Sequence, residues 1–340
     1  ERYSARAIQY GEFWQHRRWI DALPEATVRA RPMLCLARAW ALLFDPDAPE
    51  RWPVDWIERA LELSAADPRP LSEPLGRHRT DHELIRETAY VFRVGYAQFD
   101  TDPAQMVKLC LEALERLPEE AALGRGFVAL WLARAYARLN QGEAAKRAMA
   151  QARQIGLAAE GHLIPLVIAG NQASNAWSGG DLHAVARICR EAMTSLVEPA
   201  EQAGERIPQA CNAYVYLGRT LVEWNELEQA EPLLLRGIEL AELALAKHLY
   251  VDGCRDLALL HWIQGEYGQA HAWMDKAVQA CTQDPAFIHA LRARIWLAQA
   301  EQDSRWLETA IQWADGRVQE PSGEYDWELQ TLIRVRIAQY

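Results

Sequence analysis

Apolar residues recur at intervals of three and four along nearly the whole chain, and short polar turns interrupt them at regular distances. This spacing places the apolar side chains on one face of a helix. In the clearest copy, Leu217 and Gly218 close one helix and Ala230 opens the next. Small residues such as Gly218 and Ala230 are expected where two helices cross closely. The pattern predicts antiparallel helix pairs.

The turns between these helices repeat along the sequence. Four of them align on Gly142, Gly180, Asn225 and Gly265, each followed by an acidic residue. The distances of 38, 45 and 40 residues between them fall in the range of helix-pair repeats. We therefore expect an all-α, right-handed superhelix, or solenoid, of about eight antiparallel tetratricopeptide-like helix pairs.

The pattern also gives approximate helix bounds. The first helices of the pairs are predicted over Pro32–Phe44, Leu84–Phe99, Arg125–Asn140, Leu163–Trp177, Pro208–Trp224, Tyr250–Ile263, Ala286–Ala300 and Trp327–Ala338. The second helices are predicted over Gly11–Leu23, Val54–Ala65, Ala104–Leu117, Glu143–Ile155, Asp181–Leu196, Glu226–Leu245, Tyr267–Cys281 and Arg305–Ala314. Segments rich in Pro and Gly predict loops, because Pro breaks a helix; they are Asp67–Asp81, Glu198–Ile207 and Val318–Tyr325.

No change of periodicity crosses these loops, so residues 1–340 are expected to form one repeat domain. The chain begins without Met and stops within a helical pattern, which predicts a fragment of a larger protein. No apolar stretch is long enough to span a membrane. The net charge of −11 disfavours direct contact with nucleic acid, because such contact neutralises phosphates.

Sequence motifs for catalysis are lacking. The string Gly156–Leu163 lacks the Lys and hydroxyl of a phosphate-binding loop, and His78 with His82 is better explained as a solvated pair than as a metal site. We expect no enzyme activity, no metal and no cofactor in this fragment. The six cysteines are scattered through apolar helices and are expected to be reduced, in the cytoplasm. His261 and His271 are expected to be packed, as are most of the fourteen tryptophans.

Polar residues on the predicted first helices offer a candidate binding site. In a tetratricopeptide superhelix these helices line the concave groove, where clustered amides, Arg and aromatic rings can hold a ligand. The candidate ligand-binding residues are Asn171, Asn175, Trp177, Asn212, Tyr216, Arg219, Asp252, Arg255 and Asp256. They could bind a neutral polyol or sugar, or clamp an anion; alternatively, Arg255 and Asp256 pair with neighbouring helices.

The N-terminal part resembles a known family. Trp19–Glu25 (WIDALPE) and Arg29–Leu43 (RARPMLCLARAWALL) are similar to the start of the repeat domain of MalT-like regulators, the large ATP-binding activators of the LuxR class. The resemblance implies that this fragment is the effector sensor, without the nucleotide-binding module that would hold ATP and without the helix-turn-helix module. A small-molecule inducer or a regulatory protein would bind the superhelix and control oligomerisation and transcription activation, with possible self-association of the full-length protein.

Two function classes therefore remain open. The first is the sensor domain of a bacterial transcriptional activator. The second is a tetratricopeptide-repeat scaffold for protein–protein interaction, since many such solenoids bind extended peptides. No group of residues in the sequence supports the hypothesis of a helical enzyme.

Overall fold

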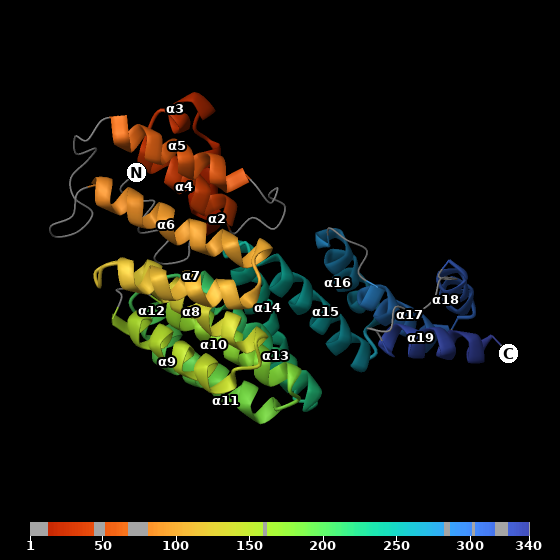
Figure 1. Cartoon of the computed structure of the whole chain (residues 1–340). Helices are drawn as coiled ribbons and strands as arrows, with labels where there is room; N and C mark the ends of the chain where they lie inside the picture. Colours follow the sequence, from red (N-terminus) through yellow and green to blue (C-terminus); the bar gives the residue numbers. More distant parts are fainter. Residues whose placement is uncertain are drawn as a thin grey trace. The chain divides into compact units, whose positions relative to one another are not determined.

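The computed structural model describes residues 13–43, 52–66, 81–158, 162–281, 286–300, 303–316 and 326–339, and within these ranges the regular structure is helical throughout. Figure 1 shows the helices in chain order. The first helices of the pairs are α4 (Pro32–Leu43), α6 (Asp81–Asp100), α8 (Ala122–Arg138), α10 (Leu163–Ser178), α13 (Cys211–Glu223), α15 (Lys247–Ile263), α17 (Ala286–Ala300) and α19 (Asp326–Ala338).

Each first helix except α19 is followed by a second helix. These are α5 (Trp52–Ala66), α7 (Pro103–Arg116), α9 (Gly142–Ala158), α11 (Leu182–Ala192), α14 (Leu227–Leu243), α16 (Tyr267–Ala280) and α18 (Arg305–Asp315). The helix α2 (Phe13–Asp21) precedes α4 as the second helix of an earlier pair. The predicted helices are confirmed to within a few residues, and the chain is an all-α solenoid.

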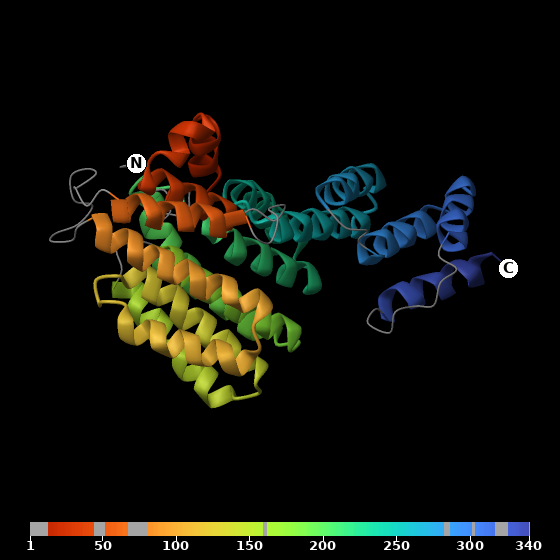
Figure 2. The same ribbon diagram turned by 45° about the horizontal axis from the view of Figure 1, so that its top comes forward.

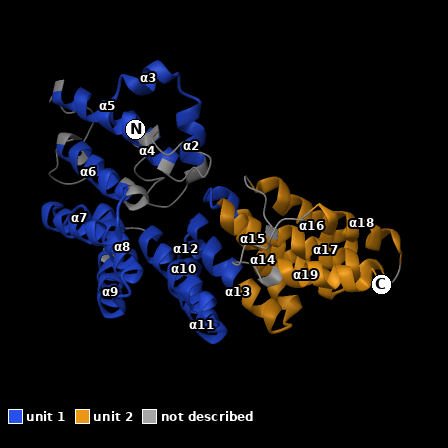
Figure 3. Ribbon diagram, turned by 45° about the vertical axis from the view of Figure 1, so that its right-hand side comes forward, with its two compact units in different colours: residues 1–216, 240–246 blue, residues 217–239, 247–340 orange. Residues whose placement is uncertain are grey.

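The chain divides into two compact units (Figure 3). The first unit holds residues 1–216 and 240–246, and the second holds residues 217–239 and 247–340. In the first unit, α4, α6, α8 and α10 contact one another in sequence, and each also packs against its own second helix. Consecutive helices of its yellow and green part run side by side in both Figure 1 and Figure 2.

The turns between paired helices share one geometry. Asn140, Gly180, Asn225 and Gly265 have φ between 57° and 77°, the left-handed conformation that ends many helices. After each of them, the next N–H donates to the carbonyl five residues earlier, as from Glu226 to Leu221 at 2.8 Å. Because Gly and Asn adopt positive φ most readily, these residue types mark the turns.

One turn lies two residues earlier than predicted. The residue equivalent to Gly180, Asn225 and Gly265 is Asn140, whereas Gly142 is the first residue of α9. The structural repeat is therefore 40, 45 and 40 residues. Alignment on Gly misplaced the turn because Asn fills the same left-handed position.

The predicted loop Glu198–Ile207 is also partly wrong. The chain continues from α11 through a π-helical turn, η1 (Met193–Val197), into a short helix, α12 (Glu198–Gln202). Pro199 lies in the first turn of α12, where its missing N–H is tolerated. Gly204, with φ of 78°, then ends the helix, and the 3₁₀ turn η2 (Pro208–Ala210) leads into α13.

The remaining loop predictions lie outside the described residues. They are Asp67–Asp81, except for Asp81 itself, which begins α6, and Val318–Tyr325. The predicted turns near Gly11 and Pro49, and the side chains of His78 and His82, lie outside them too. The short helix α3 (Glu25–Arg29), between α2 and α4, was not predicted.

The core of the first unit is built around aromatic rings on successive first helices. The Trp40 ring on α4 lies 4.7 Å from Phe92 on α6 and 5.8 Å from Phe127 on α8, and Phe127 stacks on Trp131. All four side chains are buried. The prediction that Trp40 and Trp131 pack in the core is confirmed.

The close helix crossings use small residues, as predicted. A Cβ built on Gly218 would lie 2.7 Å from the Leu234 side chain, and Ala230 is fully buried. A Cβ on Gly95 would lie 2.6 Å from the Trp131 ring. Gly is therefore required at both positions for the helices to approach.

The described cysteines are all free thiols, and five of the six are buried. Burial raises the pKa of Cys35 to about 11 and the pKa of Cys110 to about 12, so these thiols are protonated near neutral pH. His261 is buried and contacts Glu266 at 2.9 Å, and His271 stacks on Trp306. Both histidines are packed, as predicted. None of the helices in the described ranges has the length and apolarity needed to cross a membrane.

Candidate functional site

The second unit contains a cluster of charged side chains that joins α13 to α15. Asp256 lies at its centre and is almost fully buried, at 3% exposure. One of its carboxylate oxygens accepts from Nε of Arg219 at 2.7 Å, and the other accepts from Nη2 and Nε of Arg255 at 2.6 and 2.8 Å. Two guanidinium groups therefore neutralise a single buried carboxylate.

Asp252 completes the cluster one helical turn before Asp256. Its carboxylate lies 3.0 Å from Nη2 of Arg219 and 2.9 Å from Nη1 of Arg255. The side chain of Asp252 is 28% exposed and that of Arg255 is 17% exposed, so these two are the most accessible members of the cluster. The Arg255 guanidinium also lies over the Phe287 ring, 5.5 Å from its centroid.

Burial and charge act in opposite directions on these groups. Burial raises the pKa of Asp256 to about 6, although Arg219 acts to lower it. Burial likewise raises the pKa of Asp252 against the effect of Arg219. Burial alone would lower the pKa of Arg219. The nearby carboxylates of Asp256 and Asp252 outweigh this effect, so the pKa is raised above its ordinary value. With a pKa of about 6, Asp256 is charged at neutral pH, and Arg219 and Arg255 compensate this buried charge.

A second polar contact in this unit occupies the equivalent place between the first helices α17 and α19. Nε of Arg294 on α17 donates to Oγ1 of Thr331 on α19 at 2.8 Å, and both side chains are buried. The two residues of this contact are 37 positions apart, as are Arg219 and Asp256. Polar contacts at repeat-related positions thus join α13 to α15 and α17 to α19.

The remaining predicted site residues lie in the first unit. Asn171 on α10 donates from Nδ2 to the Val167 carbonyl at 2.7 Å, and Asn175 on the same helix is exposed. Trp177, near the end of α10, is half-buried. These three side chains follow one another along a single helix, and Asn175 is the one most accessible to a ligand.

Asn212 and Tyr216 on α13 are packed more tightly. A Cβ on Gly170 would lie 2.6 Å from the Asn212 amide, so Asn212 fills the space that this glycine leaves between α10 and α13. Tyr216 is only 8% exposed. The structure thus brings Arg219, Asp252, Arg255 and Asp256 together as an ion cluster within the second unit, whereas the other five candidates belong to the first unit.

One surface was missed by the sequence reasoning. Leu329, Ile333 and Ile337 on α19 are 38%, 49% and 70% exposed. The signal was present, because α19 has apolar residues on opposite sides of the helix, whereas a helix that borders solvent has a polar face. The pattern alone predicts only another first helix.

Comparison with known proteins decides the family. The model of the MalT-like TPR region matches residues 87–340. The chain belongs to the MalT-like TPR region family. No curated protein matches the chain.

Two solved structures are similar to the MalT-like TPR chain in fold. The first comes from the functional characterization of Pseudomonas aeruginosa pilF, with a TM-score of 0.51 and 17% identity over 72% of this chain and 96% of that one. The second is from the APC/C hetero-tetramer Cut9-Hcn1, with a TM-score of 0.53 and 12% identity over 94% of this chain and 58% of that one. At these identities the likeness concerns the helical-repeat fold.

Proposed function

We propose that this chain is the effector-sensing and interaction domain of a MalT-like transcriptional activator of the LuxR class. The observation that carries the proposal is the match of the MalT-like TPR region over residues 87–340. The helix-pair repeat and the similarity of Trp19–Leu43 to the start of that domain support it. In this role the chain is not catalytic, and ATP belongs to a separate nucleotide-binding module.

The side chains favoured for effector contact are the accessible polar residues of α10. Asn175 is exposed and Asn171, one helical turn earlier on the same face, is partly exposed; Trp177 is partly exposed as well, on the other side of α10. Amides hydrogen-bond hydroxyl groups, and an indole face packs on the apolar side of a sugar or an aromatic ring. The buried ion cluster of α13 and α15 serves the helix packing, since the Asp256 carboxylate accepts from both Arg219 and Arg255.

Thermal-shift screening of the 340-residue chain against neutral sugars, aromatic acids and phosphorylated metabolites tests the proposal. A true effector raises the melting temperature in a saturable way, because it binds the folded state. Asn175→Ala should weaken that ligand about tenfold, on the order of one lost hydrogen bond to a polar group. Gln105→Ala, at an exposed position of the second helix α7, is the matched control and should leave binding unchanged.

The alternative is a scaffold that binds only proteins. The apolar face of α19 favours some contribution of this kind, because exposed aliphatic side chains in a row mark interaction surfaces. Two results together would favour this alternative: no small molecule shifts the melting temperature, and a regulatory protein co-purifies with the chain but not with variants substituted on the first helices. In that case the chain does not sense a small molecule.

A further inference from the structure

The repeat places an arginine of the first unit where the second unit has part of its ion cluster. Arg219 lies six residues before the left-handed turn residue Asn225, and Arg134 on α8 lies six residues before the equivalent turn residue Asn140. Arg138 follows Arg134 on the same helix by about one turn, and both side chains are exposed. Neighbouring first helices in the two units therefore carry arginine at the same repeat position.

The next first helix differs in charge between the two units. Asp256, which accepts from Arg219, lies nine residues before the turn residue Gly265. On α10 the residue nine positions before the turn residue Gly180 is Asn171. A neutral amide therefore occupies the place that a buried carboxylate has in the second unit.

The spacing along the chain supports this correspondence. Arg134 and Asn171 are 37 positions apart, as are the two residues of each polar contact between first helices of the second unit. Arg138 and Asn175 have the same separation about one helical turn later, and α8 contacts α10. Two arginines of α8 thus correspond to two amides of α10.

The charge of these arginines is not balanced by the helices that carry the site. Neither α8 nor α10 contains Asp or Glu. Among the residues that the structure describes, the guanidinium groups of Arg134 and Arg138 have no hydrogen-bond or ion-pair partner. The carboxylates that follow these two helices are engaged elsewhere, since Glu143 lies 2.9 Å from Lys146 and Asp181 caps the first turn of α11. Two positive charges are therefore available to a ligand.

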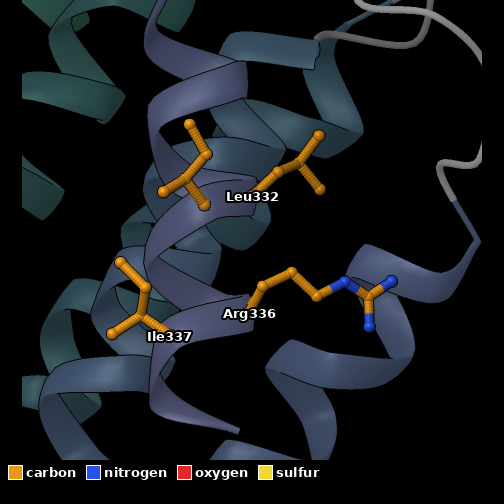
Figure 4. Close-up of a pocket in the computed structure, with 4 residues that line it drawn as sticks. Leu332, Arg336 and Ile337 are labelled. Atoms are coloured by element: carbon orange, nitrogen blue, oxygen red, sulfur yellow. The ribbon is translucent and has the colours of Figure 1, made fainter. Parts of the chain in front are cut away.

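A hollow on α19 shows the opposite arrangement. Its lining residues are Leu332, Ile333, Arg336 and Ile337 (Figure 4). Nη2 of Arg336 lies 2.8 Å from the carboxylate of Asp315 on α18. An anion at this hollow would have to compete with a carboxylate of the chain itself, whereas an anion at α8 and α10 would not.

We propose that Arg134 and Arg138 bind the doubly negative group of a small organic ligand, either a phosphate ester or a dicarboxylate. The proposal rests on the proposed sensor function and assigns a charge to the effector. Guanidinium groups donate pairs of hydrogen bonds to carboxylate or phosphate oxygens, and the amides of Asn171 and Asn175 can donate to the remaining oxygens. The ligand thus supplies the compensation that Asp256 gives in the second unit.

Thermal-shift titration of the 340-residue chain at constant ionic strength, with glucose 6-phosphate, succinate and glucose as probes, tests the proposal. At least one of the two dianions should raise the melting temperature in a saturable way, with a dissociation constant on the order of a millimolar or below. Glucose should bind at least about tenfold more weakly, because it makes no charge-assisted hydrogen bond. The difference between the two dianions tells a phosphate ester from a dicarboxylate.

Two arginine variants locate the site. Arg134→Gln should weaken binding of the dianion about tenfold or more, because a hydrogen bond to a charged group is lost. Arg153→Gln is the matched control, since Arg153 is an exposed arginine of the second helix α9 and its substitution removes the same charge. This control should leave the affinity unchanged.

A third variant tests the site without removing an arginine. Asn171→Asp restores the carboxylate that the second unit has at this repeat position, and this carboxylate should pair with Arg134. The melting temperature without ligand should stay the same or rise, while the affinity for the dianion falls about tenfold or more. A misfolded variant would instead melt at a lower temperature, so this pair of results reports charge compensation.

Three results would overturn the proposal. They are the lack of a saturable shift with either dianion, equal affinities for glucose and glucose 6-phosphate, and dianion binding that neither Arg134→Gln nor Asn171→Asp weakens. A neutral effector that depends on Asn175 but not on Arg134 would refute the anion while the sensor function holds. Failure of the sensor function has another signature, since the dianion would bind at Arg134 without changing transcription activation by the full-length activator.

Discussion

The two units join their first helices by different chemistry. In the first unit, Trp40, Phe92 and Phe127 bring aromatic rings from α4, α6 and α8 into contact. In the second unit, the corresponding helices α13 and α15 meet through Arg219 and Asp256. The helix-pair repeat therefore accepts either an apolar or a charged contact between neighbouring pairs, provided that the charged groups compensate each other.

This difference changes how polar residues on first helices should be interpreted. In the second unit, the Arg and Asp residues that suggested an anion clamp use their hydrogen-bonding capacity on one another. In the first unit, the amide groups of α10 remain partly accessible. A ligand can therefore contact Asn171 and Asn175 at a lower free-energy cost than Asp256, because contact with Asp256 would break existing ion pairs.

The largest expected effect comes from breaking the ion cluster. Asp256→Ala leaves the Arg219 and Arg255 guanidinium groups without their shared carboxylate and should reduce the free energy of unfolding by about 4 kcal/mol. Urea denaturation measures the loss. Glu239→Ala, which removes an exposed partner of Arg236, should cost less than about 1 kcal/mol. A loss below about 1 kcal/mol for Asp256→Ala would show that the cluster does not hold α13 to α15.

In the first unit, a buried histidine should make stability depend on pH. Burial lowers the pKa of His16 from 6.5 to about 4, and neither ring nitrogen has a hydrogen-bond partner among the residues that the structure describes. The unfolded state therefore binds the proton of His16 more tightly than the folded state does. The stability that depends on neutral His16 is fully present above about pH 6.5 and is lost as the pH falls towards 4. The loss attributable to His16 is at most about 3 kcal/mol.

Thermal melts of the chain and of His16→Leu between pH 7 and pH 4 check this expectation. The variant should lose less stability over this interval than the original chain. If both lose the same amount, His16 is not the group responsible.

A smaller effect is expected at the close helix crossing in the first unit. Gly95→Ala forces a methyl group to within 2.6 Å of the Trp131 ring and should cost about 2 kcal/mol. Gly142→Ala is the matched control, since a Cβ there meets no atom within 4 Å and Ala favours the helix. A stabilising Gly95→Ala would mean that Trp131 moves aside easily and that the aromatic core is loosely packed.

The smallest expected effect concerns the left-handed turn between paired helices, which both units contain. Asn140→Ala in the first unit and Asn225→Ala in the second should each cost about 1 kcal/mol, because Ala tolerates a φ near 58° less well than Asn. The corresponding Gly variants should be neutral or slightly stabilising. Unequal losses for the two Ala variants, measured by denaturation, would show that the turns are not equivalent.

Most of the fold could be predicted from local pattern. Apolar spacing predicts the first helix Ala286–Ala300 with the bounds that the structure shows, because a long helix carries several turns of the periodic pattern. The turn at Asn140 was misplaced because a Gly two residues later looked like the same signal. The segment after Glu198 was predicted as a loop, since Pro199 and Gly204 are breakers, but a π-helical turn allows the helix to continue to Gln202.

The candidate site could be predicted only in part. The sequence placed Arg219 on one first helix and Asp252, Arg255 and Asp256 on the next, within the larger candidate set. The sequence leaves open whether they bind a ligand or one another, because that depends on side-chain positions that the sequence pattern does not specify. The exposure of Ile333 depends on which helices surround α19, and this follows from tertiary packing alone.

Hydrogen exchange of the 340-residue chain, with and without a ligand found by thermal-shift screening, tests the central claim most directly. The account predicts slower exchange along the first helix α10, around Asn171 and Asn175, and unchanged exchange in the second helices α7 and α9. Protection confined to α7 and α9, with α10 unchanged, would contradict an effector site on the first helices.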